Sequence, residues 1–167
     1  MKDAQRDPKW DVLNIALGDS AGILKLNLME KSVFNSFLTP SSSETKLWED
    51  QNLIKTTLDV EINTLNNVIP GIITKYQIRN FFLKMDTQGF DMNVFRGASD
   101  FYGSIVGLQS ELPIKKIYEQ AASLTDALDE YQAAGYEVSA LYPVNPDFAE
   151  LIEMDCYMTK STLVSVR

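Results

Sequence analysis

Two carboxylates follow apolar runs in the second half of the chain. Asp86 comes directly after the run at 81–85, and Glu111 comes shortly after the run at 105–108. In open sheets of parallel strands, ligands bind outside the carboxyl ends of the strands, so neighbouring strands would bring both carboxylates to one rim. A carboxylate at such a rim can orient a hydroxyl group or accept its proton. A pair of carboxylates can alternatively hold a hard cation such as Mg²⁺ together with several waters.

Each of these residues also has an ordinary structural interpretation. An Asp between a strand and a helix is often an N-cap, and Asp86 taken alone fits that role better than a catalytic one. Glu111 taken alone fits an ordinary strand exit equally well, because Pro113 follows it. Gly89 allows a sharp turn from strand to helix and a close approach of the backbone to a ligand. The pattern by itself therefore predicts a rim and leaves the reaction open.

Charge and composition exclude several classes of partner. The chain has 167 residues, enough for one domain with its own core, and 15 Lys and Arg against 23 Asp and Glu give a formal charge of −8. This acidic balance disfavours nucleic acid as a partner, because phosphate binding needs clustered positive charge. No basic amphipathic stretch favours a membrane surface either.

The cysteine and histidine contents bear on location and chemistry. A single Cys156 cannot form an internal disulfide, and the start of the chain lacks the apolar core of a signal peptide, so a cytoplasmic location is expected. No apolar run approaches the roughly 20 residues that span a bilayer. The chain contains no histidine, which removes the commonest general base and zinc ligand.

The first third of the sequence is predicted to be rich in β-structure. Apolar residues at 12–17 indicate a strand that ends at Gly18 and Asp19, and residues 23–28 indicate a second strand after a turn. We expect these two strands to pair as a hairpin. Residues 54–62 alternate between apolar and polar, which is the period of a half-buried strand.

From residue 81 onward, strands and helices alternate. The runs at 81–86 and 104–112 are nearly continuous and apolar, as in strands that are covered on both faces. The last two strands, at 136–144 and 152–158, are expected to form an antiparallel pair.

Two helices are predicted between these strands. Apolar residues spaced by four from Phe90 line one stripe of the first helix. The second helix begins after Ser123, with Asp126 in the acid position of a capping box, and it stops at Gly135. We therefore expect an α/β fold with helices on the faces of the sheet, in a single domain 1–167 with a β-rich part at 10–65 and an α/β part at 80–160.

The stretch 82–98, "FLKMDTQGFDMNVFRGA", closely resembles the signature segment of the FkbM-type S-adenosylmethionine-dependent methyltransferases. In that family a strand ending in Lys, an apolar residue and Asp is followed by Gly, an acid and a Gly-Ala pair. The matching residues are Lys84, Asp86, Gly89, Asp91, Gly97 and Ala98. Further similar segments follow the family's order, from Trp10 to Thr159: "NIALGDSAGILKLNL", "SFLTP", "VEINTLNNVI", "LQSEL", "LYPV" and "IEMDCYM".

The resemblance implies a Rossmann-like methyltransferase sheet, mostly parallel with its last strand antiparallel. It also implies the transfer of a methyl group from S-adenosylmethionine to a hydroxyl group of a small molecule or sugar. Gly18 and Asp19 would lie near the adenine of this cofactor, and Asp86 and Gly89 near its reactive methionine end.

The resemblance also assigns roles on the acceptor side. Asp86 and Glu111 would be the catalytic carboxylates, with Glu111 on the substrate side. Lys84, Tyr118 and Glu119 would contribute to acceptor binding, although Lys84 can equally be a structural cation.

The chain departs from the family pattern in several places. Asp91 stands where Glu is usual, and Asn66 where Asp is common. The family's first strand with its Gly-rich cofactor loop, and the acid that ends its second strand, have no counterpart in this sequence. The chain thus resembles the C-terminal two-thirds of such an enzyme.

These departures leave two functions open. In the family's strand order, 3-2-1-4-5-7-6, the missing strands lie between "NIALGD" and "FFLKMD", so the latter becomes a bare edge that is open to self-association. Either the chain belongs to a methyltransferase that acts on a hydroxyl group, or it is a non-catalytic fragment or pseudo-enzyme module that needs another segment to bind the cofactor.

Overall fold

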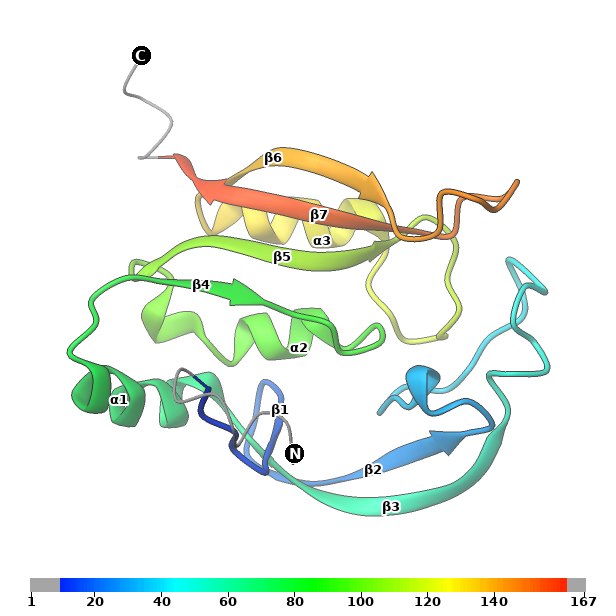
Figure 1. Ribbon diagram of the computed structural model, residues 1–167, viewed down its shortest axis with the longest axis horizontal. Helices are drawn as coiled ribbons and strands as arrows, with labels where there is room; N and C mark the ends of the chain where they lie inside the picture. Colours follow the sequence, from blue (N-terminus) through cyan, green and yellow to red (C-terminus); the bar gives the residue numbers. More distant parts are fainter. Residues whose placement is uncertain (1–9, 162–167) are drawn as a thin grey trace.

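The structure, a computed structural model, describes residues 10–161, and in it two β-sheets lie on either side of the short helix α2 (Figure 1). The strands are β1 (Ala16–Leu17), β2 (Gly22–Met29), β3 (Ile54–Asn63), β4 (Phe81–Lys84), β5 (Ile105–Pro113), β6 (Tyr136–Pro143) and β7 (Glu153–Lys160). The α-helices are α1 (Leu65–Tyr76), α2 (Asp91–Arg96) and α3 (Leu124–Ala133), and short 3-10 turns occupy Ser32–Phe34 and Ser99–Phe101. Among the described residues, no helix combines the length and the apolar character needed to cross a membrane.

The first sheet has the order β1-β3-β2, and the predicted hairpin between its first two strands is wrong. β1 pairs in parallel with the end of β3, whereas β2 pairs antiparallel along the other edge of β3. The N–H of Gly18 continues the β1 ladder by donating to the carbonyl of Asn63 at 3.0 Å. The turn after Gly18 therefore carries the chain from one edge of β3 to the other, which local turn signals cannot distinguish from a hairpin. The strand predicted at 12–17 is limited to Ala16–Leu17, and the strand predicted at 54–62 is confirmed.

The second sheet has the order β4-β5-β7-β6. β4 and β5 are parallel, and β7 runs antiparallel to both of its neighbours, β5 and β6. The α/β prediction and the antiparallel last strand are confirmed. Both sheets are mixed rather than mostly parallel, because β2 runs antiparallel to β3 in the first sheet and β7 runs antiparallel to both of its neighbours in the second.

β4 is covered on one face only, unlike the two-sided strand that the sequence predicts. Its residues alternate between half-buried and exposed, and Phe82 is 52% exposed. β4 is also the terminal strand of its sheet, as expected. β5, in contrast, is buried or half-buried along its whole length, which confirms the prediction for that strand.

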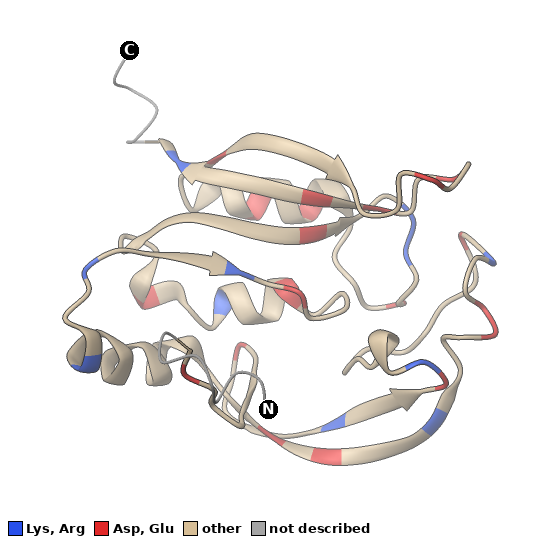
Figure 2. Cartoon of the chain, viewed as in Figure 1, with Lys and Arg blue, Asp and Glu red and all other residues tan. Residues whose placement is uncertain are grey.

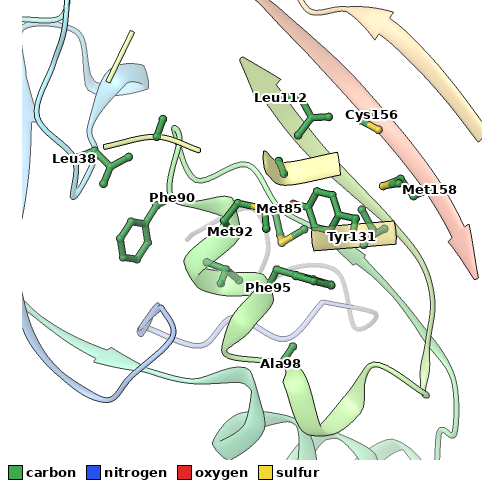
Figure 3. Close-up of a cluster of buried hydrophobic side chains, with 14 of the residues drawn as sticks. Leu38, Met85, Phe90, Met92, Phe95, Ala98, Leu112, Tyr131, Cys156 and Met158 are labelled. Atoms are coloured by element: carbon green, nitrogen blue, oxygen red, sulfur yellow. The ribbon is translucent and has the colours of Figure 1, made fainter. Parts of the chain in front are cut away.

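The core lies between α2, α3 and the second sheet (Figure 3). Phe95 of α2 is fully buried, and its ring stacks on Tyr102 at 4.3 Å and meets Tyr131 of α3 edge-on at 4.7 Å. Cys156 of β7 is also fully buried, and burial raises the pKa of its thiol to about 11. The thiol therefore remains protonated near neutral pH and packs as a small apolar group.

Both predicted helices are confirmed, together with the end signals of the second. The hydroxyl of Ser123 accepts a hydrogen bond from the N–H of Asp126 at 3.2 Å, which satisfies a free donor at the start of α3. Gly135 follows the end of α3 with a φ of +87°, a conformation that glycine adopts without strain.

Candidate functional site

The predicted rim forms where β4 and β5 end. The parallel ladder places Lys84 opposite Gln109, and the N–H of Met85 donates to the carbonyl of Gln109 at 2.8 Å. Asp86 begins the loop that leads from this point to α2. β5 continues to Pro113, so Glu111 lies among the last residues of the strand, near the end at which the sequence places it.

Asp86 does not cap the following helix. The N-cap of α2 is Phe90, and no side chain completes the cap. Instead, a carboxylate oxygen of Asp86 accepts from Lys84 Nζ at 3.1 Å, and both side chains are half exposed. This bond raises the pKa of Lys84. Asp86 is thus an accessible carboxylate beside a cation, free of the structural role that the pattern most favours.

Asp91, and not Asp86, holds the loop between β4 and α2 against β5 by hydrogen bonds. Its buried carboxylate accepts hydrogen bonds from the N–H of Thr87 at 3.0 Å and from the hydroxyl of the same residue. The other oxygen accepts from the Ser110 hydroxyl at 2.8 Å and from the N–H of Glu111 at 3.0 Å. A buried carboxylate with four donors orders the backbone on both sides of the rim. The sequence contains a signal for this role of Asp91. It is an acid in the first turn of a helix, and that helix follows a strand, an Asp and a Gly.

Gly89 approaches protein and not open space. With a φ of +82°, it lies so close to Tyr118 that a Cβ atom would be 3.0 Å from the ring. The same atom would be 3.2 Å from Leu38. The close approach predicted for Gly89 is therefore made with side chains of the protein, and its predicted contact with a cofactor stays a prediction.

Acidic groups concentrate around Glu111 at this end of the sheet. Figure 2 shows acidic residues side by side on β5 and β7, near a basic residue of β4. Burial, followed by the charges of Asp86, Glu153, Asp91 and Asp155, raises the pKa of Glu111 to about 8. Burial, followed by the charges of Asp91, Asp86 and Asp155, raises the pKa of Glu153 to about 7. Near neutral pH the Glu111 carboxyl group therefore holds its proton for most of the time.

A pocket of about 290 Å³ opens next to Asp86. It lies between the end of β1, the segment after β2 and the loop that follows β4. Its lining residues are Ile15, Ala16, Leu17, Leu26, Asn35, Ser36, Phe37, Asp86, Thr87, Gln88 and Phe90. Apolar side chains from the first sheet thus face polar groups of the loop across one cavity.

Gly18 and Asp19 adjoin this pocket without lining it. Gly18 packs against Phe90, whose ring would be 3.3 Å from a Cβ atom at this glycine. Asp19 accepts a hydrogen bond from the amide of Asn93, on α2, at 3.1 Å. The structure therefore brings the turn after β1 to the helix that follows Asp86, although the two are far apart in sequence.

Tyr118 and Glu119, which the resemblance assigns to the acceptor side, differ in their exposure. Tyr118 lies in an irregular segment after β5 and is 1% exposed. Its hydroxyl donates to the carbonyl of Phe34 at 2.8 Å and lies 3.2 Å from Oε1 of Gln88. Glu119 is exposed, and its N–H donates to the carbonyl of Thr39 at 2.9 Å. Tyr118 therefore supports the loop from inside the protein.

The carboxylates of the rim do not form a metal-binding group of three or more. Within residues 10–161, no three Cys, Asp or Glu side chains lie close enough together to hold a metal ion. Binding of Mg²⁺ by Asp86 and Glu111 stays a prediction.

Comparison with known proteins identifies the family. The model of the Methyltransferase FkbM domain matches residues 3–138, which is more than half of the chain. The chain belongs to the FkbM methyltransferase family. No curated protein and no solved structure matches it.

The extent of the FkbM match is informative about the rim. The matched region contains Asp86, Glu111 and Tyr118, and it ends within β6. β7 lies beyond it, yet β7 sits between β5 and β6 and contributes Glu153 and Asp155 to the surroundings of Glu111. Sequence reasoning overlooked these two acids, because only the pairing of β7 with β5 brings them to the rim.

Proposed function

We propose that this FkbM-family chain transfers a methyl group from S-adenosylmethionine to a hydroxyl group of a small molecule or sugar. The observation that carries the proposal is the pocket beside Asp86, next to the rim that also holds Glu111. Membership of the family supports methyl transfer as the reaction. We further propose that the two sheets are parts of one Rossmann-like methyltransferase sheet.

The pocket has the chemistry for one end of a ligand. Its volume of about 290 Å³ lies at the lower limit of small-molecule sites, which is about 300 Å³, so it suits an acceptor or one portion of the cofactor. Leu17 and Phe90 offer apolar walls, while Asp86 and the amide of Gln88 offer polar groups. In this proposal Gly18, Asp19 and Gly89 surround the cofactor.

Each residue of the rim has a role in the proposed reaction. When bound, the cofactor would supply an activated methyl group, carried on a sulfonium, for transfer to the acceptor oxygen. Holding the hydroxyl in line with this group supplies much of the rate. Asp86 orients the acceptor hydroxyl and accepts its proton, and Glu111 can take it only in its ionised form, which is the minor form near neutral pH. Lys84, Tyr118 and Glu119 are proposed to shape the acceptor side.

A second candidate function rests on the edges of the sheets. β1 and β4 are each the terminal strand of a sheet, and each has a parallel neighbour on its other side. Phe82 on β4 is 52% exposed. These features suit a non-catalytic or incomplete module in which another segment pairs with the edges and completes the cofactor site. For either function we propose a cytoplasmic location, which the buried free Cys156 suits.

Calorimetry with S-adenosylmethionine and with its demethylated product tests the two candidates. If the chain acts as a methyltransferase, we expect binding at micromolar levels that Asp86→Ala weakens about tenfold or more, since Asp86 lines the pocket. The matched control is Asp147→Ala, which removes an exposed carboxylate from the loop between β6 and β7. Absence of binding at millimolar cofactor would contradict methyl transfer by the chain alone and support the second candidate.

A further inference from the structure

Gln88 lies in the loop between Asp86 and Asp91 in an unusual backbone conformation. Its φ is +51° and that of Gly89 is +82°, so two consecutive residues occupy the left-handed region, which glycine tolerates and other residues seldom adopt. The buried hydroxyl of Ser36 holds this conformation by donating to the carbonyl of Gln88 at 2.7 Å. A strained residue at the edge of a pocket is a reason to look for a function of its side chain.

The amide of Gln88 bridges Tyr118 and Glu111. Its Oε1 lies 3.2 Å from the hydroxyl of Tyr118, and its Nε2 lies 3.5 Å from Oε2 of Glu111. The contact with Glu111 is the longer of the two. The Tyr118 hydroxyl is itself fixed by the 2.8 Å hydrogen bond to the carbonyl of Phe34. The single phenol proton of Tyr118 is shared between the carbonyl of Phe34 and, more weakly, the amide oxygen of Gln88, so the NH₂ group of Gln88 faces Glu111.

Most of the charged groups around Glu111 oppose its ionisation. Lys84 of β4 lies within electrostatic reach, but its ammonium group is hydrogen-bonded to Asp86. The remaining charged groups that act on Glu111 are carboxylates from the loop after β4, from α2 and from β7: Asp86, Asp91, Glu153 and Asp155. The NH₂ group of Gln88 is a neutral donor that can stabilise the ionised carboxylate without a charge of its own.

We propose that Gln88 is a positioning residue, whose amide, fixed by Tyr118, orients the carboxyl group of Glu111 and favours its ionised form. The inference rests on the proposed function in one respect, because an ionised Glu111 is the form that can accept a proton from an acceptor hydroxyl. Gln88 thereby makes Glu111 a usable second base beside Asp86. Gln88 acts only by its effect on Glu111, so it needs no contact with the reacting atoms.

A carbon-13 NMR titration of labelled glutamate carboxyl groups tests this role. The resonance of Glu111 is identified by its loss in Glu111→Gln. In Gln88→Leu, we expect the pKa of Glu111 to rise by about half a pH unit or more, because one hydrogen bond to the ionised form is lost. An unchanged or lowered pKa would overturn the proposal, since the amide would then be neutral toward the ionised form or favour the protonated one.

Two further variants keep the test decisive. In Gln88→Asn, the new residue suits a left-handed backbone better than leucine does. Its side chain is one methylene too short for the amide to bridge Tyr118 and Glu111, so we expect the pKa of Glu111 to rise as in Gln88→Leu. The matched control is Gln109→Leu, which removes an amide from the same strand as Glu111. That amide donates to Asp155 at 2.8 Å and not to Glu111, so its loss removes no hydrogen bond from the Glu111 carboxylate and should not raise the pKa of Glu111.

The titration is independent of methyl transfer, since it requires neither cofactor nor acceptor. A shift in Gln88→Leu without any cofactor binding by the unmodified chain would support the positioning role and contradict the proposed function. Cofactor binding with no shift in either Gln88 variant would contradict the positioning role alone.

Discussion

At the scale of single residues, the two acids of the signature segment have separate tasks. Asp91 is buried and satisfies four donors that hold the loop to β5, whereas Asp86 remains half exposed at the pocket. Because Asp91 supports the loop, Asp86 is available to bind a ligand. The sequence-based interpretation of Asp86 as a helix cap is wrong because α2 begins only at Asp91 and its N-cap is Phe90.

Replacing Asp91 should therefore destabilise the fold. In Asp91→Asn, an NH₂ group replaces one of the two carboxylate oxygens and faces the N–H donor of either Thr87 or Glu111, so we expect the free energy of unfolding to fall by about 1–3 kcal/mol. Urea unfolding measures this change. The control Asp129→Asn alters an exposed carboxylate on α3 and should change the free energy of unfolding little. Equal effects of the two substitutions would show that the buried carboxylate does not hold the loop.

The raised pKa of Glu111 should make stability depend on pH. The pKa of its carboxyl group rises from about 4.5 to about 8 on folding, so between these values the folded chain binds more protons than the unfolded chain. The stabilisation is complete below about pH 4.5 and is lost as the pH rises through about 8. We expect Glu111→Gln, which cannot ionise, to lose less stability than the unmodified chain between about pH 5 and pH 9.

The urea concentration at the midpoint of unfolding, measured at about pH 5 and at about pH 9, tests this expectation. Glu119→Gln is the control, because Glu119 is exposed and its loss should leave the pH dependence as it is. Parallel pH profiles for the unmodified chain and Glu111→Gln would contradict the assignment of the raised pKa to Glu111.

At the scale of elements, the edges of the sheets are the main feature. β4 is a terminal strand with one uncovered face, and it exposes Phe82 next to Gly107 of β5. Such an edge presents unpaired backbone groups to other chains. The charge of −8 opposes the association of two copies, and salt screens this repulsion.

Self-association through β4 is accordingly expected to grow with salt and protein concentration. Phe82→Lys places a charge on the edge and should reduce the association, as seen by light scattering on a sizing column. Ile23→Lys is the matched control, since Ile23 is 73% exposed on β2, in the other sheet. A chain that remains monomeric under all conditions, or that responds equally to both substitutions, would argue against this edge as the contact.

At the scale of the whole molecule, the candidate site is assembled from segments that are distant in sequence. The pocket joins the end of β1, the segment after β2 and the loop after β4. The acidic surroundings of Glu111 join β5 and the loop after β4 to α2 and to β7. Both depend on α2 lying between the two sheets, as Figure 1 shows.

The sequence by itself determined the α/β class, most of the strands, the ends of α3, and the family through the segment around Asp86. These are set by local periodicity, capping and turn residues, and the structure or the family match confirms them. It also placed Asp86 and Glu111 at the ends of two neighbouring parallel strands, and the structure confirms that β4 and β5 are such neighbours.

Only the tertiary structure decided which strands pair and which acids meet. The pairing of β1 with β3 depends on contacts between distant segments, whereas the place of β7 between β5 and β6 agrees with the strand order that the resemblance implies. Local turn and hydrophobic signals carry no information about such contacts. For the same reason, the bonds of Asp91, the burial of Tyr118 and the acids of β7 around Glu111 followed from packing alone.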